Sequence, residues 1–178
     1  LLQAKARELL ATIADYLITR QAGFGLSPTA TQATSAIFGG VLASGASTYV
    51  TNDTATSGLA MLYAYRVTAA SRYLVSARAA ASFLRNVQAI GSNATVFTSS
   101  NAAGTSRLYT GSLASEVSTA TAFDCNDQFY PNALIALEFW NDLKTTDGDQ
   151  SIGATAAVTG FDTTPSKLLS DSITDLRT

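Results

Sequence analysis

The sequence contains no histidine and only one cysteine among its 178 residues. Zinc sites are built mostly from cysteine and histidine, and the common serine and cysteine hydrolases use histidine as their general base. The lone Cys125 has no partner for a disulfide within the chain. Zinc centres of the usual kinds, Ser-His and Cys-His nucleophiles and internal disulfides are therefore excluded, and we expect no metal and no other cofactor.

Charge and long apolar runs are also scarce. Only 13% of the residues are charged, and the formal net charge is -2. Nucleic-acid binding needs a basic patch, and a transmembrane helix needs about 18 consecutive apolar residues; the sequence has neither feature. We expect no nucleic acid and no membrane span, and the expected partners are other protein chains or the rest of its own chain, with glycans as a further candidate.

Length and hydrophobic content fit one domain. With 47% hydrophobic residues, residues 1–178 can bury a core of ordinary size. The amphipathic start, LLQAKARELL, has neither an initiator methionine nor a signal-peptide pattern. We expect a single domain or a fragment of a larger one.

The stretch from Asn52 to Gln88 predicts two helices. Apolar residues recur in it every three or four positions, which is the spacing of one buried helical face. The pattern breaks between Thr68 and Ser71, and Ser71 can cap the second helix. A turn this short favours an antiparallel helical hairpin.

Three further helices are expected, at 1–21, at about 129–143 and at about 165–176. Long polar connections separate them, and strand pieces are expected at 96–97 and 108–109. The connection 26–51 fits a strand, a hairpin or a short helix. The predicted buried side of the first helix consists of Leu2, Ala6, Leu9, Leu10, Ile13, Tyr16 and Leu17.

The chain contains an internal repeat. Residues 35–48 match residues 106–119, with seven of fourteen positions identical, including Gly40 with Gly111. Before this match, Ala14-Asp15-Tyr16-Leu17 aligns with Ala81-Ser82-Phe83-Leu84 and Gln21 aligns with Gln88; after it, Asn52-Asp53 aligns with Asn126-Asp127. The repeat therefore spans roughly 14–67 and 81–143, and repeated helical hairpins must stack to bury their apolar faces.

Part of the hairpin resembles a known packing motif. Arg72-Tyr73-Leu74, Ala77, Ala80 and Phe83-Leu84 are similar to the pattern Y-x-x-T-G-D-x-R-Y-L-x-x-A-x-x-A-x-x-F-L of the α/α-toroid proteins, the six-hairpin glycosidase-like superfamily. The chain departs from this pattern at 68–71, where it has Thr-Ala-Ala-Ser. The resemblance implies a mainly α fold of antiparallel helical hairpins with long polar, partly β loops, as part of an α/α toroid or a stacked helical repeat.

The same resemblance implies where catalytic carboxylates would lie, at or near helix starts or in the loops at one end. The candidates here are Asp53, Asp124 and Asp127. Glycoside hydrolysis needs two carboxyl groups, one protonated and one ionised. Asp53 and Asp127 also fit helix N-caps, and their presence in both repeats favours the N-cap interpretation, because each hairpin needs its own cap.

Three aromatic residues adjoin polar loops and are candidates for carbohydrate contact, since aromatic rings stack on sugar rings. They are Tyr109, Tyr130 and Trp140. Other aromatic residues at helical spacing are expected in the core.

Two functions follow as hypotheses. The first is a structural or interaction module of a larger extracellular, cell-surface or virion-like assembly that contacts glycans through its loops. The alternative is a carbohydrate-active enzyme of α/α-toroid type, either a glycoside hydrolase or a polysaccharide lyase.

Overall fold

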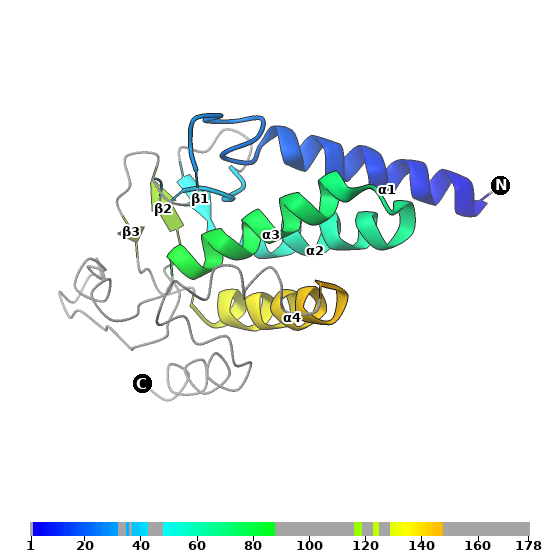
Figure 1. Ribbon diagram of the computed structural model, residues 1–178. Helices are drawn as coiled ribbons and strands as arrows, with labels where there is room; N and C mark the ends of the chain where they lie inside the picture. Colours follow the sequence, from blue (N-terminus) through cyan, green and yellow to red (C-terminus); the bar gives the residue numbers. More distant parts are fainter. Residues whose placement is uncertain are drawn as a thin grey trace.

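The computed structural model describes residues 2–31, 35, 37–42, 48–87, 116–118, 123–124 and 129–147. This part of the chain is mainly helical, which confirms the mainly α class. In chain order, its elements are α1 Leu2–Thr19, β1 Thr48–Val50, α2 Thr51–Thr68, α3 Ser71–Asn86, β2 Glu116–Ser118, β3 Phe123–Asp124 and α4 Phe129–Asp147 (Figure 1). The helix expected at 165–176 and the strand pieces expected at 96–97 and 108–109 lie outside the described residues.

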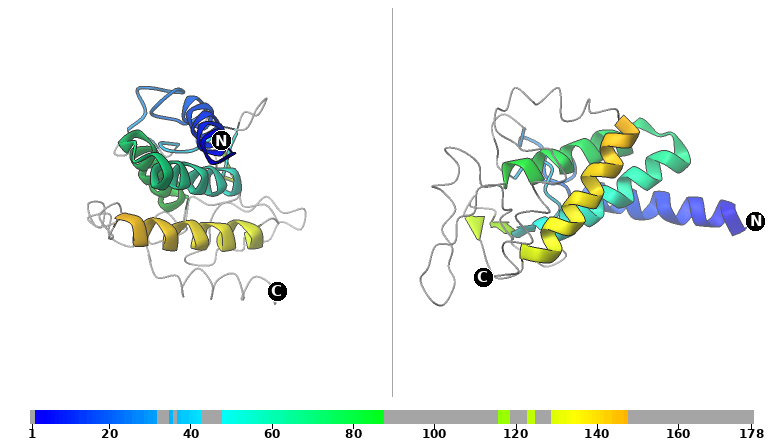
Figure 2. Two further views of the ribbon diagram at one scale, coloured as in Figure 1. Left: turned by 90° about the vertical axis from the view of Figure 1, so that its right-hand side faces the viewer. Right: turned by 90° about the horizontal axis from the view of Figure 1, so that it is seen from below.

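Helix α2 is the centre of the arrangement. It packs against α1, α3 and α4. Successive helices run in alternate directions, and α4 crosses the others obliquely (Figures 1 and 2). A helix covered on several sides cannot have one broad polar face, and the buried residues of α2 accordingly include small and polar types as well as Met61 and Leu62.

The predicted hairpin is confirmed as α2 and α3. The turn between them uses Ala69 in the left-handed conformation (φ 56°), and the Ala69 N–H donates to the carbonyl oxygen of Tyr65 at 2.7 Å. The helix ends differ slightly from the prediction, because Ser71 is the first residue of α3 and Ala70 occupies its N-cap without a side-chain cap hydrogen bond.

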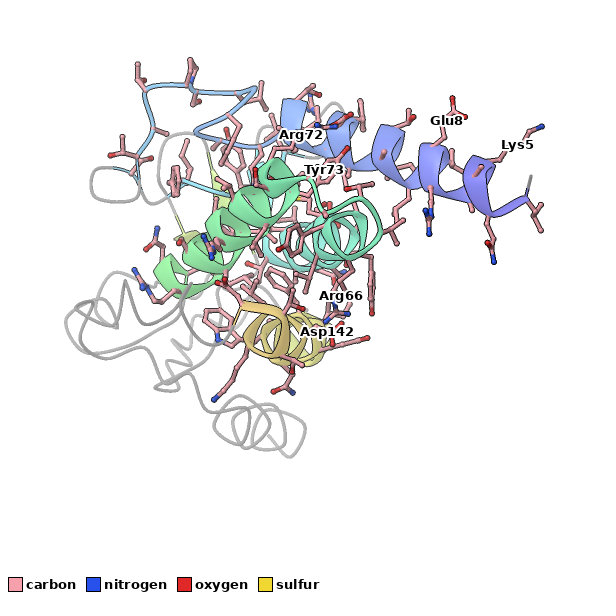
Figure 3. All side chains as sticks on the ribbon, turned by 45° about the vertical axis from the view of Figure 1, so that its right-hand side comes forward. Lys5, Glu8, Arg66, Arg72, Tyr73 and Asp142 are labelled. Carbon is pink, nitrogen blue, oxygen red and sulfur yellow. The ribbon has the colours of Figure 1, made fainter. Side chains whose placement is uncertain are left out.

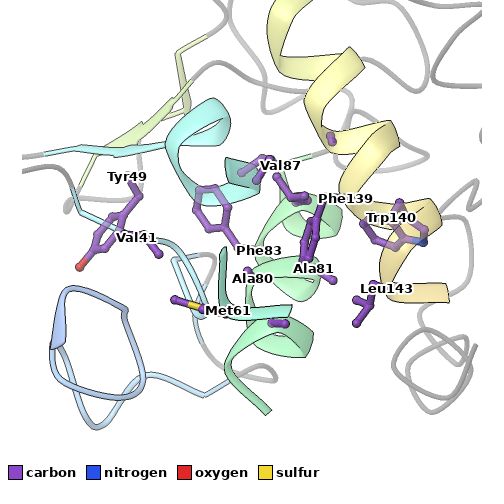
Figure 4. Packing of buried hydrophobic residues seen from close by; sticks show 14 of the residues in the cluster. Val41, Tyr49, Met61, Ala80, Ala81, Phe83, Val87, Phe139, Trp140 and Leu143 are labelled. Carbon is purple, nitrogen blue, oxygen red and sulfur yellow. The ribbon is translucent and has the colours of Figure 1, made fainter. Parts of the chain in front are cut away.

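The contact between α2 and α4 depends on a glycine. A Cβ atom at Gly58 would lie 2.5 Å from Cζ of Phe139, so only glycine allows this close approach. Phe139 and Trp140 pack with Leu143 and with Phe83 of α3 in the main core cluster (Figure 4). Burial of several large side chains at one site is the main stabilising contribution.

A three-stranded antiparallel sheet lies at the end of the molecule where α2 begins (Figure 1). In it, β2 lies between β1 and β3, with Thr48 opposite Ser118 and Val50 opposite Glu116. Glu116 in turn lies opposite Asp124 of β3. β1 begins at the last residue of the repeated segment 35–48, and β2 lies within the repeated segment 106–119.

The connection after α1 folds back on itself and covers α3. The Gly39 N–H donates to the Ala22 carbonyl at 3.0 Å, and the Ala22 N–H donates to the Gly40 carbonyl at 2.9 Å. Gly39 has φ 84°, and a Cβ atom there would overlap the carbonyl group of Ala79 in α3. Glycine is required at this position for both reasons.

Gln21 fixes this connection to the helix. Its side chain is fully buried, and Nε2 donates to the carbonyl oxygens of Gly39 at 2.9 Å and Ser76 at 3.0 Å. The Ser76 hydroxyl donates to Oε1 of Gln21, and Sδ of Met61 lies 2.9 Å from the same hydroxyl. A buried amide is tolerated only when its polar atoms are bonded in this way.

The prediction of which side of the first helix is buried is wrong. Helix α1 is amphipathic, but Leu2, Ala6, Leu9, Ile13 and Tyr16, predicted to be buried, are exposed. The helix instead packs through Ala14, which is fully buried, with the partly buried Leu10 and Ile18 beside it. The small Ala14 side chain allows a close approach to the neighbouring helices, and the larger apolar residues are left on the outside.

We predict that Gln21→Ala lowers the free energy of unfolding by about 2–3 kcal/mol, because buried polar groups of Gly39 and Ser76 lose a hydrogen-bond partner. Urea denaturation followed by circular dichroism measures this change. Gln3→Ala is the matched control, since Gln3 is an exposed residue of α1, and its cost should stay within about 0.5 kcal/mol. Equal effects of the two substitutions would contradict the role assigned to Gln21.

Candidate functional site

Four of the seven large apolar side chains that are exposed in the described part of the chain lie on one side of α1. We define the α1 face as Leu2, Ala6, Leu9, Thr12, Ile13, Tyr16 and Thr19. All seven are exposed, and the largest of them have exposed fractions of 84% for Leu2, 61% for Leu9, 56% for Tyr16 and 43% for Ile13.

The apolar members of this face form a narrow stripe. At about 100° of rotation per residue, the four largest side chains lie within an arc of about 60°. None of the seven residues is charged. By the same rotation, Lys5 lies between Thr12 and Tyr16, within the arc of the α1 face, and Glu8 lies outside this arc.

The opposite side of α1 holds the helix to the hairpin. Ala14 packs with Ala64 and Tyr73 in a second, smaller apolar cluster. Arg72 bonds both carboxylate oxygens of Asp15, at 3.0 and 3.2 Å, and its guanidinium carbon lies 4.4 Å from the centre of the Tyr73 ring (Figure 3). Burial, and then the hydrogen bond of Asp15, raise the pKa of the Tyr73 phenol. The helix is therefore attached through its C-terminal half, and its N-terminal half extends past the α2–α3 turn (Figure 1).

Other arginine side chains connect α4 to the hairpin. Arg66 bonds Oδ2 of Asp142 at 3.2 Å (Figure 3), and Arg78 bonds Oδ2 of Asp147 at 2.8 Å. Asp142 raises the pKa of the Tyr63 phenol, first by a hydrogen bond and then by its negative charge. Arg66 and Arg78 are thus paired across helices and do not form an anion site.

The candidate carboxylates lie at the sheet end of the molecule where the structure describes them. Asp53 is exposed in the first turn of α2. The N-cap of that helix is Val50, without a side-chain cap hydrogen bond, so Asp53 is the third helical residue and not the cap. A carboxylate in the first turn still interacts favourably with the helix dipole. Asp127 lies outside the described residues.

Asp124 is placed by its backbone. It lies directly opposite Glu116, which lies directly opposite Val50 at the start of α2. Opposite residues of antiparallel strands have Cα atoms about 4.5–5.5 Å apart. The register therefore brings the backbones of Glu116 and Asp124 together. Glu116 also pairs with β1, the strand that leads directly into the helix that carries Asp53.

The candidate sugar-contact residues do not form one described surface. Trp140 is 2% exposed and packs in the main core cluster (Figure 4). Its ring is therefore part of the core in this structure and has no free face on which a sugar could stack. Tyr130 lies in the first turn of α4, and Tyr109 lies outside the described residues.

The chain matches no protein-family profile, no curated protein and no solved structure. Among the described helices, none is both long and apolar enough to cross a membrane. Within the same residues, no group of three or more Cys, Asp or Glu side chains could hold a metal ion. The α1 face is therefore the feature from which a function can best be argued.

Proposed function

We propose that this protein is a structural module that joins a larger protein assembly through the α1 face. The observation that carries the proposal is the exposure of Leu2, Leu9, Ile13 and Tyr16 on one side of a single helix. Contiguous exposed apolar side chains are typical of protein contact sites, whereas scattered ones are ordinary.

The chemistry of the face supports a protein partner. Interface centres are depleted in charged residues and enriched in aromatic ones. The α1 face combines Tyr16 with aliphatic residues, and Lys5 is the one charged residue of α1 within its arc. An amphipathic helix binds an apolar groove or helix through residues spaced at three, four and seven positions. Leu2, Leu9, Ile13 and Tyr16 have these spacings.

The location of the assembly is part of the same proposal. An extracellular, cell-surface or virion setting is supported by the low charge and by the long connections rich in Ser, Thr and Ala. Glycans would be contacted by those connections, near Tyr109 and Tyr130, and not by the α1 face.

We predict that a photo-crosslinking amino acid at position 9, introduced in cells or particles that contain the protein, forms a covalent adduct with protein. The reason is that Leu9 lies near the centre of the α1 face. Denaturing gels and mass spectrometry detect the adduct. The matched control has the same amino acid at position 8, because Glu8 is also exposed but lies off the face.

An adduct at position 9 that is at least several-fold stronger than at position 8 supports the module. No protein adduct at either position, or equal adducts at both, would contradict the proposal. Circular dichroism of both variants verifies that each retains the helical fold.

A carbohydrate-active enzyme is the second candidate, and the strand register favours it specifically. The register places the backbones of Asp124 and Glu116 directly opposite each other, and glycoside hydrolysis needs two carboxyl groups at one site. Asp53 lies in the helix that follows the neighbouring strand.

For this candidate we predict turnover of at least one polysaccharide, measured as new reducing or unsaturated ends. Asp124→Asn should then lower the rate by at least about 100-fold, as expected for loss of a general acid or base. Glu8→Gln, an exposed control, should leave the rate unchanged. Turnover that is absent from the parent protein, or equal in both variants, would rule out the enzymatic proposal.

A further inference from the structure

An exposed tyrosine lies where α2 and α4 meet. Tyr63 is 42% exposed, although many residues of the helix that carries it are buried. Arg66 and Val67 are exposed on the same side of α2, because residues three and four positions apart are neighbours on a helix surface. The Tyr63 ring is therefore open to solvent beside charged side chains of both helices.

The Tyr63 ring is held in position before any ligand arrives. Its phenol group is hydrogen-bonded to Asp142 of α4, and the guanidinium carbon of Arg66 lies 5.3 Å from the ring centre. Arg66 is itself fixed by Oγ1 of Thr146, at 2.8 and 3.0 Å, and by the carboxylate and carbonyl oxygens of Asp142, at 3.2 and 3.1 Å (Figure 3). A surface that is already ordered loses little conformational entropy on binding.

A carboxylate with open acceptor positions lies beside this ring. Glu138 precedes Asp142 by about one turn of α4 and is exposed, and in the described part of the chain it has no hydrogen-bond or ion-pair partner. The hydrogen bond of Asp142 raises the pKa of the Tyr63 phenol most, and the negative charge of Glu138 raises it further. The ring and the Glu138 carboxylate are therefore close enough to face one ligand.

The charges around the ring select the kind of ligand. Arg66 and Asp142 form an ion pair, so Glu138 is the one charge of this group that is not balanced. An anion would be repelled by the two carboxylates, and Arg66 already occupies the position of a cation over the Tyr63 ring. A neutral ligand with several hydroxyl groups fits both parts, since hydroxyl groups donate to a carboxylate and the C–H face of a sugar packs on an aromatic ring.

We propose that Tyr63 and Glu138 bind a neutral oligosaccharide, with one sugar ring stacked on Tyr63 and its hydroxyl groups donating to the Glu138 carboxylate. Asp142 and Arg66 position the Tyr63 ring. The site goes beyond the proposed function and does not depend on it, because no residue of the α1 face takes part. It also differs from the sugar contacts predicted from the sequence, among which Trp140 is buried.

Affinity electrophoresis in gels that contain one soluble neutral polysaccharide, a glucan, mannan, galactan or xylan, detects binding even when it is weak. We expect at least one of the four to retard the protein. Tyr63→Ala should weaken the binding at least about 10-fold through loss of the stacking surface, whereas Tyr63→Phe keeps the ring and should stay within about 3-fold of the parent. Each mobility is compared with that in a gel without polysaccharide.

Glu138→Ala tests the second contact at an exposed position where loss of the fold is not expected. It should also weaken the binding at least about 10-fold, as expected for loss of hydrogen bonds to a charged acceptor. Glu8→Ala is the matched control, because Glu8 is an exposed residue of α1, and it should bind like the parent. Circular dichroism verifies that every variant retains the helical fold.

Two results would overturn the sugar site. One is the absence of retardation by all four polysaccharides. The other is equal retardation of the parent, Tyr63→Ala and Glu138→Ala. Binding of a trilysine peptide that is lost in Tyr63→Ala, without binding of any polysaccharide, would instead show a site for a cationic partner and would also overturn it. Each of these results leaves the α1 contact intact, because that contact is tested separately by crosslinking from position 9.

Discussion

The packing of the connection after α1 onto α3 depends on one buried amide, that of Gln21. Its side chain bonds the connection and the helix at the same time, and Gly39 allows the two backbones to touch. Because the connection is held there, β1 and the start of α2 lie beside it, and the Val41 N–H donates a hydrogen bond to Oγ1 of Thr54 in α2 at 3.0 Å. The positions of α1, α2 and α3 thus follow from one polar contact within an apolar core.

This packing also explains why α1 is left with an open side. The connection after α1 covers α3, but no described residue covers the α1 face. The apolar residues Leu9, Ile13 and Tyr16 are then suited to a contact outside the described residues, which is the physical basis of the structural module that we propose.

The sequence predicted the hairpin well and the surfaces poorly. The ends of α2 and α3 lie within two residues of the prediction, because strong periodicity flanks a short break at 68–71. The same periodicity identified the apolar residues of α1 but not which side would be covered, since that depends on where a neighbour packs.

Asp53 was predicted as a cap, but β1 continues directly into α2 and leaves Val50 at that position. Trp140 adjoins polar sequence, yet the approach of α4 to Gly58 carries it into the core. Gln21 could have been recognised as structural from its match with Gln88, a polar residue repeated at a helix end.

Hydrogen exchange of the α1 and α3 amides, followed by mass spectrometry of the isolated protein and of the protein within its assembly, tests the central claim most directly. We expect the amides of Ser76–Asn86 to be protected in both states. The amides of the exposed half of α1 should exchange rapidly in the isolated protein and gain protection in the assembly. Amides of α1 that are as protected as those of α3 in the isolated protein would show that the α1 face is covered within a single chain, and would contradict the account.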